Sequence, residues 1–307
     1  MKNAAEISII VPAFNEAENI PLLVEATRDM MQDSNLACEL IIVDDGSCDN
    51  TYDVARSLQK QHRFVKIVRH VRNRGITDAL LSGFEHAAGG IYVFYPADLQ
   101  YDPREIPALV EPLRHGADIV TGWKTGQYEK KFVSSVYNAL SRWLFKVPVH
   151  DLNSVKAFKR EVAETLPMRR DWHRYMVVIA AQEGYHLEEV RMTLHKRRHG
   201  RSKFGFWRIP VGVLDLIAVK LQTTFGSKPM LLFGSLGTLS IGAGMITGLI
   251  ALYLRIVHGI GFRPLLYLVI LLVLAGLSLF ALGFLGEAIA SVSERLARVE
   301  KKIQKSK

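Results

Sequence analysis

The stretch "ELIIVDDGS", residues 39–47, is an apolar run that ends abruptly in two aspartates, a glycine and a serine. The same pattern occurs before it in "ISIIVPAFNE" (7–16) and after it in "IYVFYPAD" (91–98). Segments with helical patterning separate these runs. Near-continuous Val/Ile runs that alternate with helices indicate a parallel sheet covered on both faces. We therefore expect an α/β domain built on a mostly parallel sheet.

This alternation extends through roughly the first 125 residues, and its elements can be assigned from the patterning. Strands are predicted at 7–14, 39–47, 65–71, 91–97 and 118–123, and helices at 16–31, 50–62, 77–89 and 104–116. Beyond residue 126 the pattern loosens, with a helix predicted at 129–145 and a further strand at 187–198.

Polar residues gather where these strands end. They are Asn15 and Glu16, Asp44 and Asp45, Asn73, and Asp98 and Gln100. Ligands of open parallel sheets bind at the carboxyl ends of the strands, which makes this set a candidate site. Taken alone, the loop at 98–103 also fits an ordinary polar turn closed by Asp-Pro. The glycine-rich motifs of dinucleotide-binding and P-loop proteins are absent, so a different ligand is expected.

Two long segments, 230–254 and 264–286, contain no charged residue. A helix needs about 20 apolar residues to cross the hydrocarbon core, and both segments are long enough. They predict two membrane spans rather than two buried core helices. In the first span Ser240, Gly244 and Gly248 form a row of small residues suited to close helix contact.

A basic amphipathic segment lies directly before the first span. Its apolar residues recur at spacings of three and four: Trp207, Val211, Leu214, Ala218, Leu221 and Phe225. Lys203, Arg208 and Lys220 flank this row. Such a helix is typical of the membrane interface, although an ordinary packed surface helix has the same pattern.

Charge predicts the orientation. The tail at 294–307 carries six Lys/Arg against two Glu, which places it in the cytoplasm by the positive-inside rule. The apolar run near the start breaks at Pro12 and is too brief for a signal peptide, so the first domain is also expected in the cytoplasm. The net charge of +9 fits an anionic membrane surface better than nucleic acid. Cys38 and Cys48 suggest neither a disulfide framework nor a metal site.

Five ordered segments carry a family resemblance: "SIIVPAFNEAENI", "IIVDDGSCDNT", "NRGITDALLSGFEHAAG", "PADLQYDP" and "RHGRSKF". Together they resemble family 2 glycosyltransferases over residues 6–205, and most closely the polyprenyl-phosphate glycosyltransferases of the dolichyl-phosphate mannose synthase group. The resemblance implies a GT-A fold and inverting transfer of a sugar from a UDP- or GDP-sugar to undecaprenyl or dolichyl phosphate. It also implies a divalent cation, Mg²⁺ or Mn²⁺, as cofactor.

The resemblance assigns roles to the residues at the strand ends. Those that would hold the nucleoside are Pro12, Asn15, Glu16, Asp44, Asp45, Gly46 and Ser47. The family's Asp-x-Asp-x-Gln motif holds the metal and the diphosphate, and its second Asp and its Gln match Asp98 and Gln100. Its first Asp is replaced by Pro96, whose side chain cannot ligate a cation. Since Mg²⁺ often takes only one or two protein carboxylates, Asp98 with Gln100 would suffice.

Basic residues match the family's phosphate-contacting positions. Arg197, Ser202 and Lys203 take the places of its Arg-x-x-Gly-x-Ser-Lys motif, and Arg197 and Lys203 are expected to position the acceptor phosphate. Upstream, Lys124 and Lys130 match a basic pair, with Lys130 where the family usually has Arg. Asp151 matches a family Asp that would orient the acceptor or the sugar, but a helix or turn cap is an equal alternative.

The implied organisation has four parts: a catalytic domain at 1–203, an interfacial helix and linker at 204–228, two spans within 229–287 and a basic tail at 288–307. The protein is expected in the inner or plasma membrane. A heptad-like seam in the tail, formed by Ile289, Val292, Leu296, Val299 and Ile303, is compatible with a homo-oligomer.

Two other functions remain open. The loss of the first motif Asp at Pro96 fits a degenerate, non-catalytic protein that binds nucleotide sugars in the membrane. A polysaccharide synthase subunit is the other alternative, but it should have a Gln-x-x-Arg-Trp motif and more spans. The segment "QEGYH" at Gln182 does not supply that motif.

Overall fold

The computed structural model describes residues 5–125, 131–152, 154–166, 168, 172–195, 208–226 and 228–305. The chain separates into two compact units, Met1–Phe206 and Trp207–Lys307. The expected roles of the four sequence segments, including that of 204–228, stay predictions.

The first unit is built on one seven-stranded sheet with the strand order β3-β2-β1-β4-β6-β5-β7. The strands are β1 (Ile7–Ala13), β2 (Cys38–Asp44), β3 (Val65–Arg69), β4 (Ile91–Phe94), β5 (Ile119–Thr125), β6 (Lys156–Lys159) and β7 (Leu187–Thr193). Strand β6 is antiparallel to β4 and β5, and all other pairs are parallel. The predicted mostly parallel α/β architecture is therefore confirmed.

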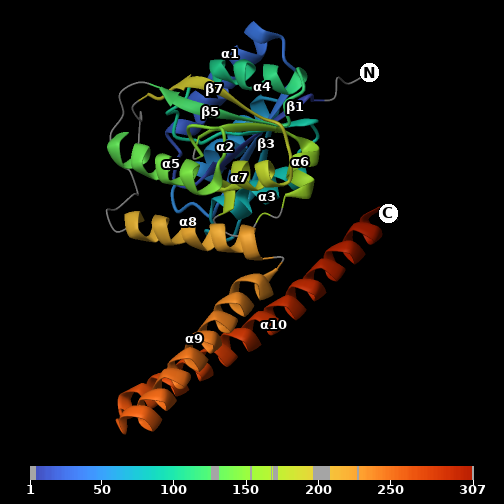
Figure 1. The fold of residues 1–307 in the computed structure, drawn as a ribbon. Coiled ribbons are helices and arrows are strands. Elements are labelled where there is room, and N and C mark those ends of the chain that lie inside the picture. The colour runs from blue at the N-terminus through green and yellow to red at the C-terminus, as the bar shows by residue number, and fades with distance from the viewer. Residues whose placement is uncertain are drawn as a thin grey trace. The chain divides into compact units, whose positions relative to one another are not determined.

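Helices cover both faces of this sheet, with α1 and α4 on one face and α3 and α7 on the other (Figure 1). The helices of the unit are α1 (Asn19–Ser34), α2 (Thr51–Gln61), α3 (Ile76–His86), α4 (Ile106–Arg114), α5 (Lys131–Phe145), α6 (Arg160–Thr165) and α7 (Met176–Gln182), with two short 3-10 turns, η1 (Pro103–Glu105) and η2 (Trp172–Arg174). Every residue of β2 is buried, which explains why its central residues, Leu40 to Val43, are apolar without alternation.

The strand order fixes where polar side chains can meet. Because β1, β2, β4 and β5 run in the same direction, their carboxyl ends lie at one edge of the sheet. The amino end of β6 lies at the same edge because β6 runs the opposite way. The sequence did not predict β6, α6 or α7. Strand β6 has only four residues and two of them are lysines, so it lacks an apolar run.

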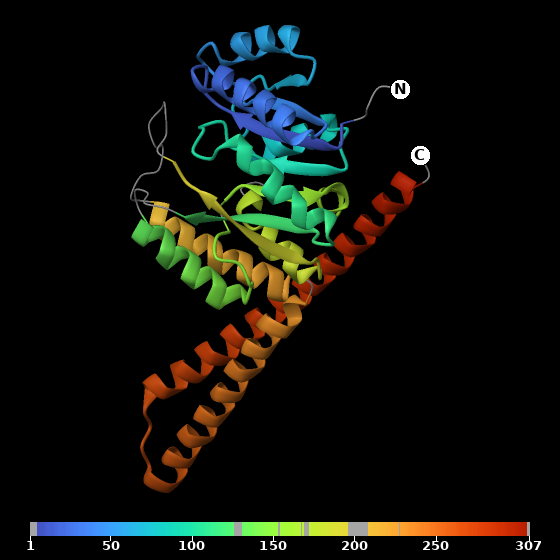
Figure 2. The ribbon, with the colours of Figure 1, turned by 90° about the horizontal axis from the view of Figure 1, so that it is seen from above.

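The second unit contains α8 (Arg208–Phe225), α9 (Pro229–His258) and α10 (Arg263–Lys305), and Figure 2 shows α9 and α10 side by side. Two segments, Pro229–His258 and Arg263–Ser293, are long and apolar enough to cross a membrane, and only 6% of the most apolar window of each is buried. These segments agree with the two predicted spans. Helix α10 continues without a break through the basic tail to Lys305.

Small residues bring α9 and α10 together. A Cβ atom on Gly237 would lie 2.7 Å from the Gly276 carbonyl oxygen, so only glycine permits this approach. The hydroxyl of Ser240 donates to the Leu272 carbonyl oxygen at 2.8 Å. A Cβ on Gly244 would lie 2.9 Å from Val273. The row of small residues predicted from the sequence thus makes the close contact within this hairpin.

Candidate active site

The loops that follow β1 and β2 hold each other at the edge of the sheet. The backbone N–H of Asn15 donates to Ser47 Oγ at 2.9 Å, and the Cys48 N–H donates to Asn15 Oδ1 at 2.9 Å. One residue further on, the Glu16 N–H donates to Thr51 Oγ1 at 2.8 Å. Asn15 and Ser47, both predicted to hold a nucleoside, therefore also fix the shape of these two loops.

Gly46 is the point where the loop after β2 passes closest to its neighbour. Its φ of +71° lies in the left-handed region, and an added Cβ would lie 2.4 Å from the Arg72 carbonyl carbon. Any side chain here would clash with backbone that cannot move aside, so glycine is required. Pro12, another predicted residue, pairs with Val43 in the sheet and lies beyond the end of the β1–β4 ladder.

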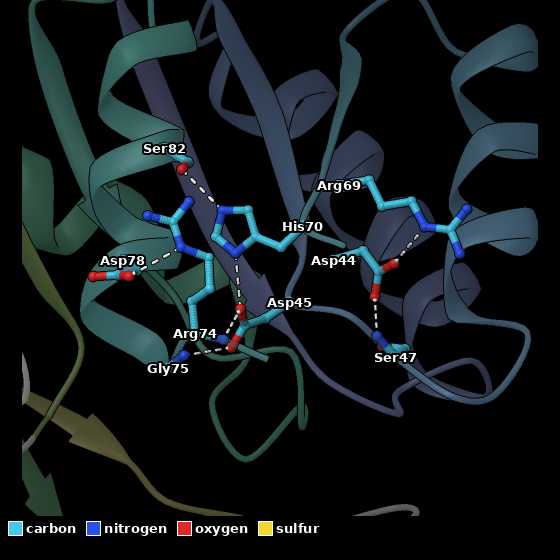
Figure 3. Close-up of polar contacts among 9 residues, drawn as sticks. All are labelled: Asp44, Asp45, Ser47, Arg69, His70, Arg74, Gly75, Asp78 and Ser82. Carbon is cyan, nitrogen blue, oxygen red and sulfur yellow. Dashed lines mark hydrogen bonds and ion pairs between the residues drawn. The ribbon is translucent and has the colours of Figure 1, made fainter. Parts of the chain in front are cut away.

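Asp45 organises the start of α3 (Figure 3). Its Oδ1 accepts from the Arg74 N–H at 2.9 Å, and its Oδ2 accepts from the Gly75 N–H at 2.8 Å. The ring Nδ1 of His70 lies 2.8 Å from Oδ1, while the ring Nε2 lies 2.9 Å from Ser82 Oγ in α3. Both oxygens of this buried carboxylate are therefore used to hold the protein together.

Asp44 is equally buried but is bonded differently (Figure 3). Its Oδ1 accepts from the Ser47 N–H at 3.1 Å. Its Oδ2 accepts no hydrogen bond from the described residues and lies 3.6 Å from the Nε of Arg69. The Arg69 guanidinium in turn lies 4.2 Å from the ring centre of Tyr52. A buried acceptor with spare capacity calls for an explanation, and a ligand N–H is one.

The loop after β4 alternates between the core and the open side. Tyr95, Ala97, Leu99 and Tyr101 are buried, whereas Pro96, Asp98 and Gln100 are partly exposed. The Tyr95 hydroxyl donates to the Tyr101 carbonyl oxygen, which closes the loop on its buried side. Pro96, which replaces the first carboxylate of the motif, is therefore partly exposed, as are the two motif residues that remain, Asp98 and Gln100.

Asp98 and Gln100 are tied to their surroundings. The Gln100 N–H donates to Asp98 Oδ1 at 3.2 Å, and Gln100 exchanges backbone and side-chain hydrogen bonds with His195. Asp102 caps η1 by accepting from the Arg104 N–H at 3.0 Å. The interpretation as a turn closed by Asp-Pro is therefore correct for Asp102.

The residues present suit a hard divalent cation. Among the described residues no group of three or more His, Cys, Asp or Glu side chains forms a metal cluster. One carboxylate and one amide oxygen, at Asp98 and Gln100, match the sparse protein ligation of Mg²⁺, which takes its other ligands from phosphates and water. The donor set fits the cation, provided a phosphate-bearing substrate completes the shell.

At the other end of the edge, Asp151 and Lys124 form an ion pair. Lys124 Nζ, on β5, lies 3.1 Å from Asp151 Oδ2, and the side chains are 15% and 3% exposed. The Asp151 backbone is held on both sides, because its carbonyl accepts from Thr121 Oγ1 at 3.2 Å and its N–H donates to Glu189 Oε1 at 3.2 Å. The carboxylate of Asp151 is therefore paired with the Lys124 ammonium, and its role toward the acceptor or the sugar stays a prediction.

Glu189, on β7, anchors the loop that carries Asp151. Its Oε1 also accepts from the His150 N–H at 2.7 Å, and its Oε2 lies 2.7 Å from His150 Nδ1. The His150 ring stacks on Trp123 with 4.0 Å between ring centres, and the Arg191 guanidinium lies 5.0 Å from the Trp123 ring. These contacts fix the loop to β5 and β7.

Four of the predicted site residues, Lys130, Arg197, Ser202 and Lys203, lie outside the described residues. The structure adds residues that the sequence did not single out: Arg69, His70, Arg74, Lys156, His173 and Glu189. Arg69 and His70 lie near the end of the strand predicted at 65–71, so the rule of polar strand ends could have found them. Nothing in the pattern distinguishes Lys156 or Glu189 from surface residues.

Comparisons with known proteins agree with this geometry. A family model described as glycosyl transferase family 2 matches residues 8–166. The dodecaprenyl-phosphate galacturonate synthase of Rhizobium johnstonii is 33% identical over 299 residues, which covers 93% of this chain and 88% of that protein. The undecaprenyl-phosphate 4-deoxy-4-formamido-L-arabinose transferase of Pseudomonas aeruginosa is 27% identical over 289 residues, covering 92% of this chain and 84% of that protein.

A solved structure shares the fold. The glucosyl-3-phosphoglycerate synthase of Mycobacterium tuberculosis, in complex with Mn²⁺, uridine diphosphate and glucosyl-3-phosphoglycerate, has a TM-score of 0.57 at 21% identity. The similarity covers 72% of this chain and 80% of that one. At this level of identity the similarity is evidence for the fold, and it confirms the predicted GT-A fold of the first domain.

Proposed function

Because the chain belongs to glycosyl transferase family 2, we propose that it is an inverting transferase that moves a sugar from a nucleotide sugar to a polyprenyl phosphate. The observation that carries the proposal is the presence, in one chain, of a polar sheet edge and of two helices apolar enough to cross a membrane. The two relatives named above support it, because the names of both specify a prenyl phosphate and a sugar, and their similarity extends over more than nine-tenths of this chain.

The donor end of the site is assigned to the loops after β1, β2 and β4. Asp44 has a buried oxygen available for an N–H of the nucleobase. Asn15, Glu16, Gly46 and Ser47 shape the surrounding loops, and Asp45 holds the start of α3 behind them. Asp98 and Gln100 would hold Mg²⁺ or Mn²⁺ at the diphosphate. A divalent cation bound there would neutralise charge on the departing nucleoside diphosphate.

The acceptor end is assigned to Lys124, Asp151 and the basic segment with Arg197 and Lys203. A prenyl phosphate has a second pKa near 6, so it is largely dianionic at pH 7 and needs little help from a general base. One phosphate oxygen forms a bond to the anomeric carbon while the bond from that carbon to the diphosphate oxygen breaks. Positive side chains lower the repulsion between the two anions, and Asp151 orients Lys124 for this task.

The membrane face completes the proposal. We assign the catalytic domain and the basic tail to the cytoplasmic side, because the excess of Lys/Arg lies in the tail. Leu214, Ile217 and Leu221 of α8 are large apolar side chains that are 65%, 47% and 44% exposed, which suits a helix that rests on the bilayer interface.

The test uses the full-length protein in nanodiscs with undecaprenyl phosphate and a panel of UDP- and GDP-sugars. We expect one donor to yield a lipid-linked monosaccharide, detected by mass spectrometry, and the Asp98→Asn variant to yield none. If no donor gives such a product while the wild type still binds nucleotide and cation, the transferase proposal is wrong.

That outcome would favour the second candidate, a non-catalytic protein that binds nucleotide sugars. Its specific support is Pro96, which leaves one carboxylate in the metal motif. Replacing Pro96 by Asp restores the second carboxylate at a partly exposed position. A transferase should keep or raise its activity in this variant, whereas a degenerate protein would gain cation affinity without turnover.

A further inference from the structure

Lys156 is a buried lysine at the sheet edge that the proposed reaction does not yet use. It begins β6, where it stands opposite Phe94 of β4 and Thr121 of β5, and it is 1% exposed. Its amine donates to the Ser154 carbonyl oxygen at 2.8 Å and lies 5.7 Å from the ring centre of Phe94. Lysines are almost never fully buried unless they are paired, so packing alone does not account for this position.

The site of Lys156 is next to the charged pair at the acceptor end. The groups that act on its amine are the Asp151 carboxylate, from the loop before β6, and the Lys124 ammonium of β5. The buried His173 lies in η2, and the positive charges of Arg174 and Lys156 both act to lower the pKa of its ring. Helix α4 packs on the other face of the sheet, where Ala157 lies in the core.

These surroundings make the charge of Lys156 sensitive to its neighbours. Burial lowers the pKa of the Lys156 amine to about 7, the Asp151 carboxylate raises it and the Lys124 ammonium lowers it further. Burial also lowers the pKa of His173 to about 3, so that ring is neutral near pH 7 and adds no charge. Because the pKa of Lys156 lies near 7, an anion that binds close by raises the protonated fraction of this amine, since a negative charge favours the protonated form.

We propose that Lys156 is a positioning residue whose amine takes up a proton from solvent when the anionic acceptor binds, and that the resulting ammonium holds Asp151 and Lys124 in place around the phosphate. The inference rests on the proposed function, since it needs a phosphate at this end of the edge. Before a phosphate binds, a pKa of about 7 leaves about half of the Lys156 amines neutral near pH 7, which reduces the cost of burying a charge. With phosphate bound, the ammonium offsets part of the added negative charge.

The test is calorimetric titration of the full-length protein in detergent with farnesyl phosphate, in the presence of Mg²⁺ and uridine diphosphate. Titrations at pH 7.5 in Tris and in HEPES, which differ in ionisation enthalpy, give the number of protons taken up. We expect the wild type to take up roughly half a proton more per site than the Lys156→Met variant. The matched control is Lys159→Met, a lysine of the same strand that pairs with Asp118 at 2.7 Å; it should behave as wild type.

The Lys156→Arg variant separates charge from packing. A guanidinium stays protonated, so this variant should also take up no extra proton, yet it should bind farnesyl phosphate equally well at pH 7 and pH 9. The wild type should lose affinity by roughly tenfold or more over that range as its amine becomes harder to protonate.

Equal proton uptake in wild type and Lys156→Met would overturn the inference and leave the transferase proposal standing. If neither variant folds, the wild type still decides, because the absence of proton uptake and of pH-dependent affinity in it also overturns the inference. A complete lack of heat with both farnesyl phosphate and uridine diphosphate would contradict the proposed function itself and this inference with it.

Discussion

Asp44 and Asp45 are neighbours at the end of β2, yet only Asp45 has both carboxylate oxygens in hydrogen bonds with described residues. Asp45 uses its oxygens on the backbone before α3 and on His70, whereas Asp44 keeps Oδ2 buried beside Arg69. The family motif treats the two as one nucleoside-binding unit. The structure bonds the two differently: Asp45 holds loops together, whereas the assignment of Asp44 to the donor is our proposal.

The Asp44→Asn variant should bind uridine diphosphate more weakly without unfolding. The substitution removes the charge from the acceptor that we assign to the nucleobase, and a charge-assisted hydrogen bond contributes about 1.5–3 kcal/mol. The dissociation constant should therefore rise roughly tenfold to a hundredfold. Calorimetry with uridine diphosphate and Mg²⁺ measures it. Unchanged affinity would remove Asp44 from the donor site.

The Asp45→Asn variant should mainly lose stability. Its amide can accept hydrogen bonds through only one atom, so at least one of the donors on Arg74, Gly75 and His70 loses its partner, at a cost of about 1–3 kcal/mol. A thermal melt of the full-length protein in detergent should show a drop of several degrees. Asp78→Asn is the control, because its ion pair with Arg74 is on the surface and should contribute little. Equal melting of both variants would refute the organising role of Asp45.

The Asp98→Asn variant should lose the cation-dependent part of nucleotide binding. Asp98 is the carboxylate left in the motif, and an amide is a much weaker ligand for Mg²⁺ than a carboxylate. Titration of uridine diphosphate with and without Mg²⁺ should show a difference for the wild type and none for the variant. Asp102→Asn serves as control, since its carboxylate caps η1 and should leave the cation effect intact. A retained cation effect in Asp98→Asn would place the metal elsewhere.

His173 should make the folded protein sensitive to acid. Burial, Arg174 and Lys156 lower the pKa of His173 from 6.5 to about 3. Between these two pH values the ring of His173 is protonated in the unfolded chain but neutral in the folded protein. Stability therefore falls as the pH drops from 6.5 toward 3, by about 2 kcal/mol between pH 7 and pH 5. The His173→Gln variant can keep a hydrogen bond to Thr77 and should lose this part of the fall.

Melting temperatures at pH 5 and pH 7 measure this effect. The gap between them should be smaller in His173→Gln than in the wild type by roughly 4–8 °C. His115→Gln is the control, because that ring is 70% exposed and replacing it should leave the gap unchanged. If both variants showed the same difference in melting temperature between pH 5 and pH 7 as the wild type, His173 would not be the cause of the acid sensitivity.

Much of the sheet could be predicted because buried parallel strands need continuous apolar runs. Strand β2 is the clearest case, since all seven of its residues are buried. Strand β6 could not be predicted, because Lys156 and Lys159 look like surface residues until the neighbouring strands enclose the first of them. The site follows the same division. Polar residues after strands could be recognised by position, but the different bonding of Asp44 and Asp45 depends on Arg69, at the end of β3, and on Arg74 and Gly75 in the loop that follows it.

Glu189→Gln should slow transfer without weakening donor binding. The Glu189 carboxylate accepts from the N–H groups of both His150 and Asp151, so it fixes the loop that aims Asp151 at Lys124. Loss of its charge should lower kcat by about tenfold, if a charge-assisted hydrogen bond contributes roughly 1.5 kcal/mol. Affinity for uridine diphosphate with Mg²⁺ should stay the same, because Asp44 and Asp98 are assigned to the donor. Glu188→Gln is the matched control: its side chain is 43% exposed and lies 4.0 Å from His186, so its kinetics should equal those of the wild type. A variant at Glu189 with normal kcat and weakened nucleotide binding would move the Asp151 loop to the donor end of the site.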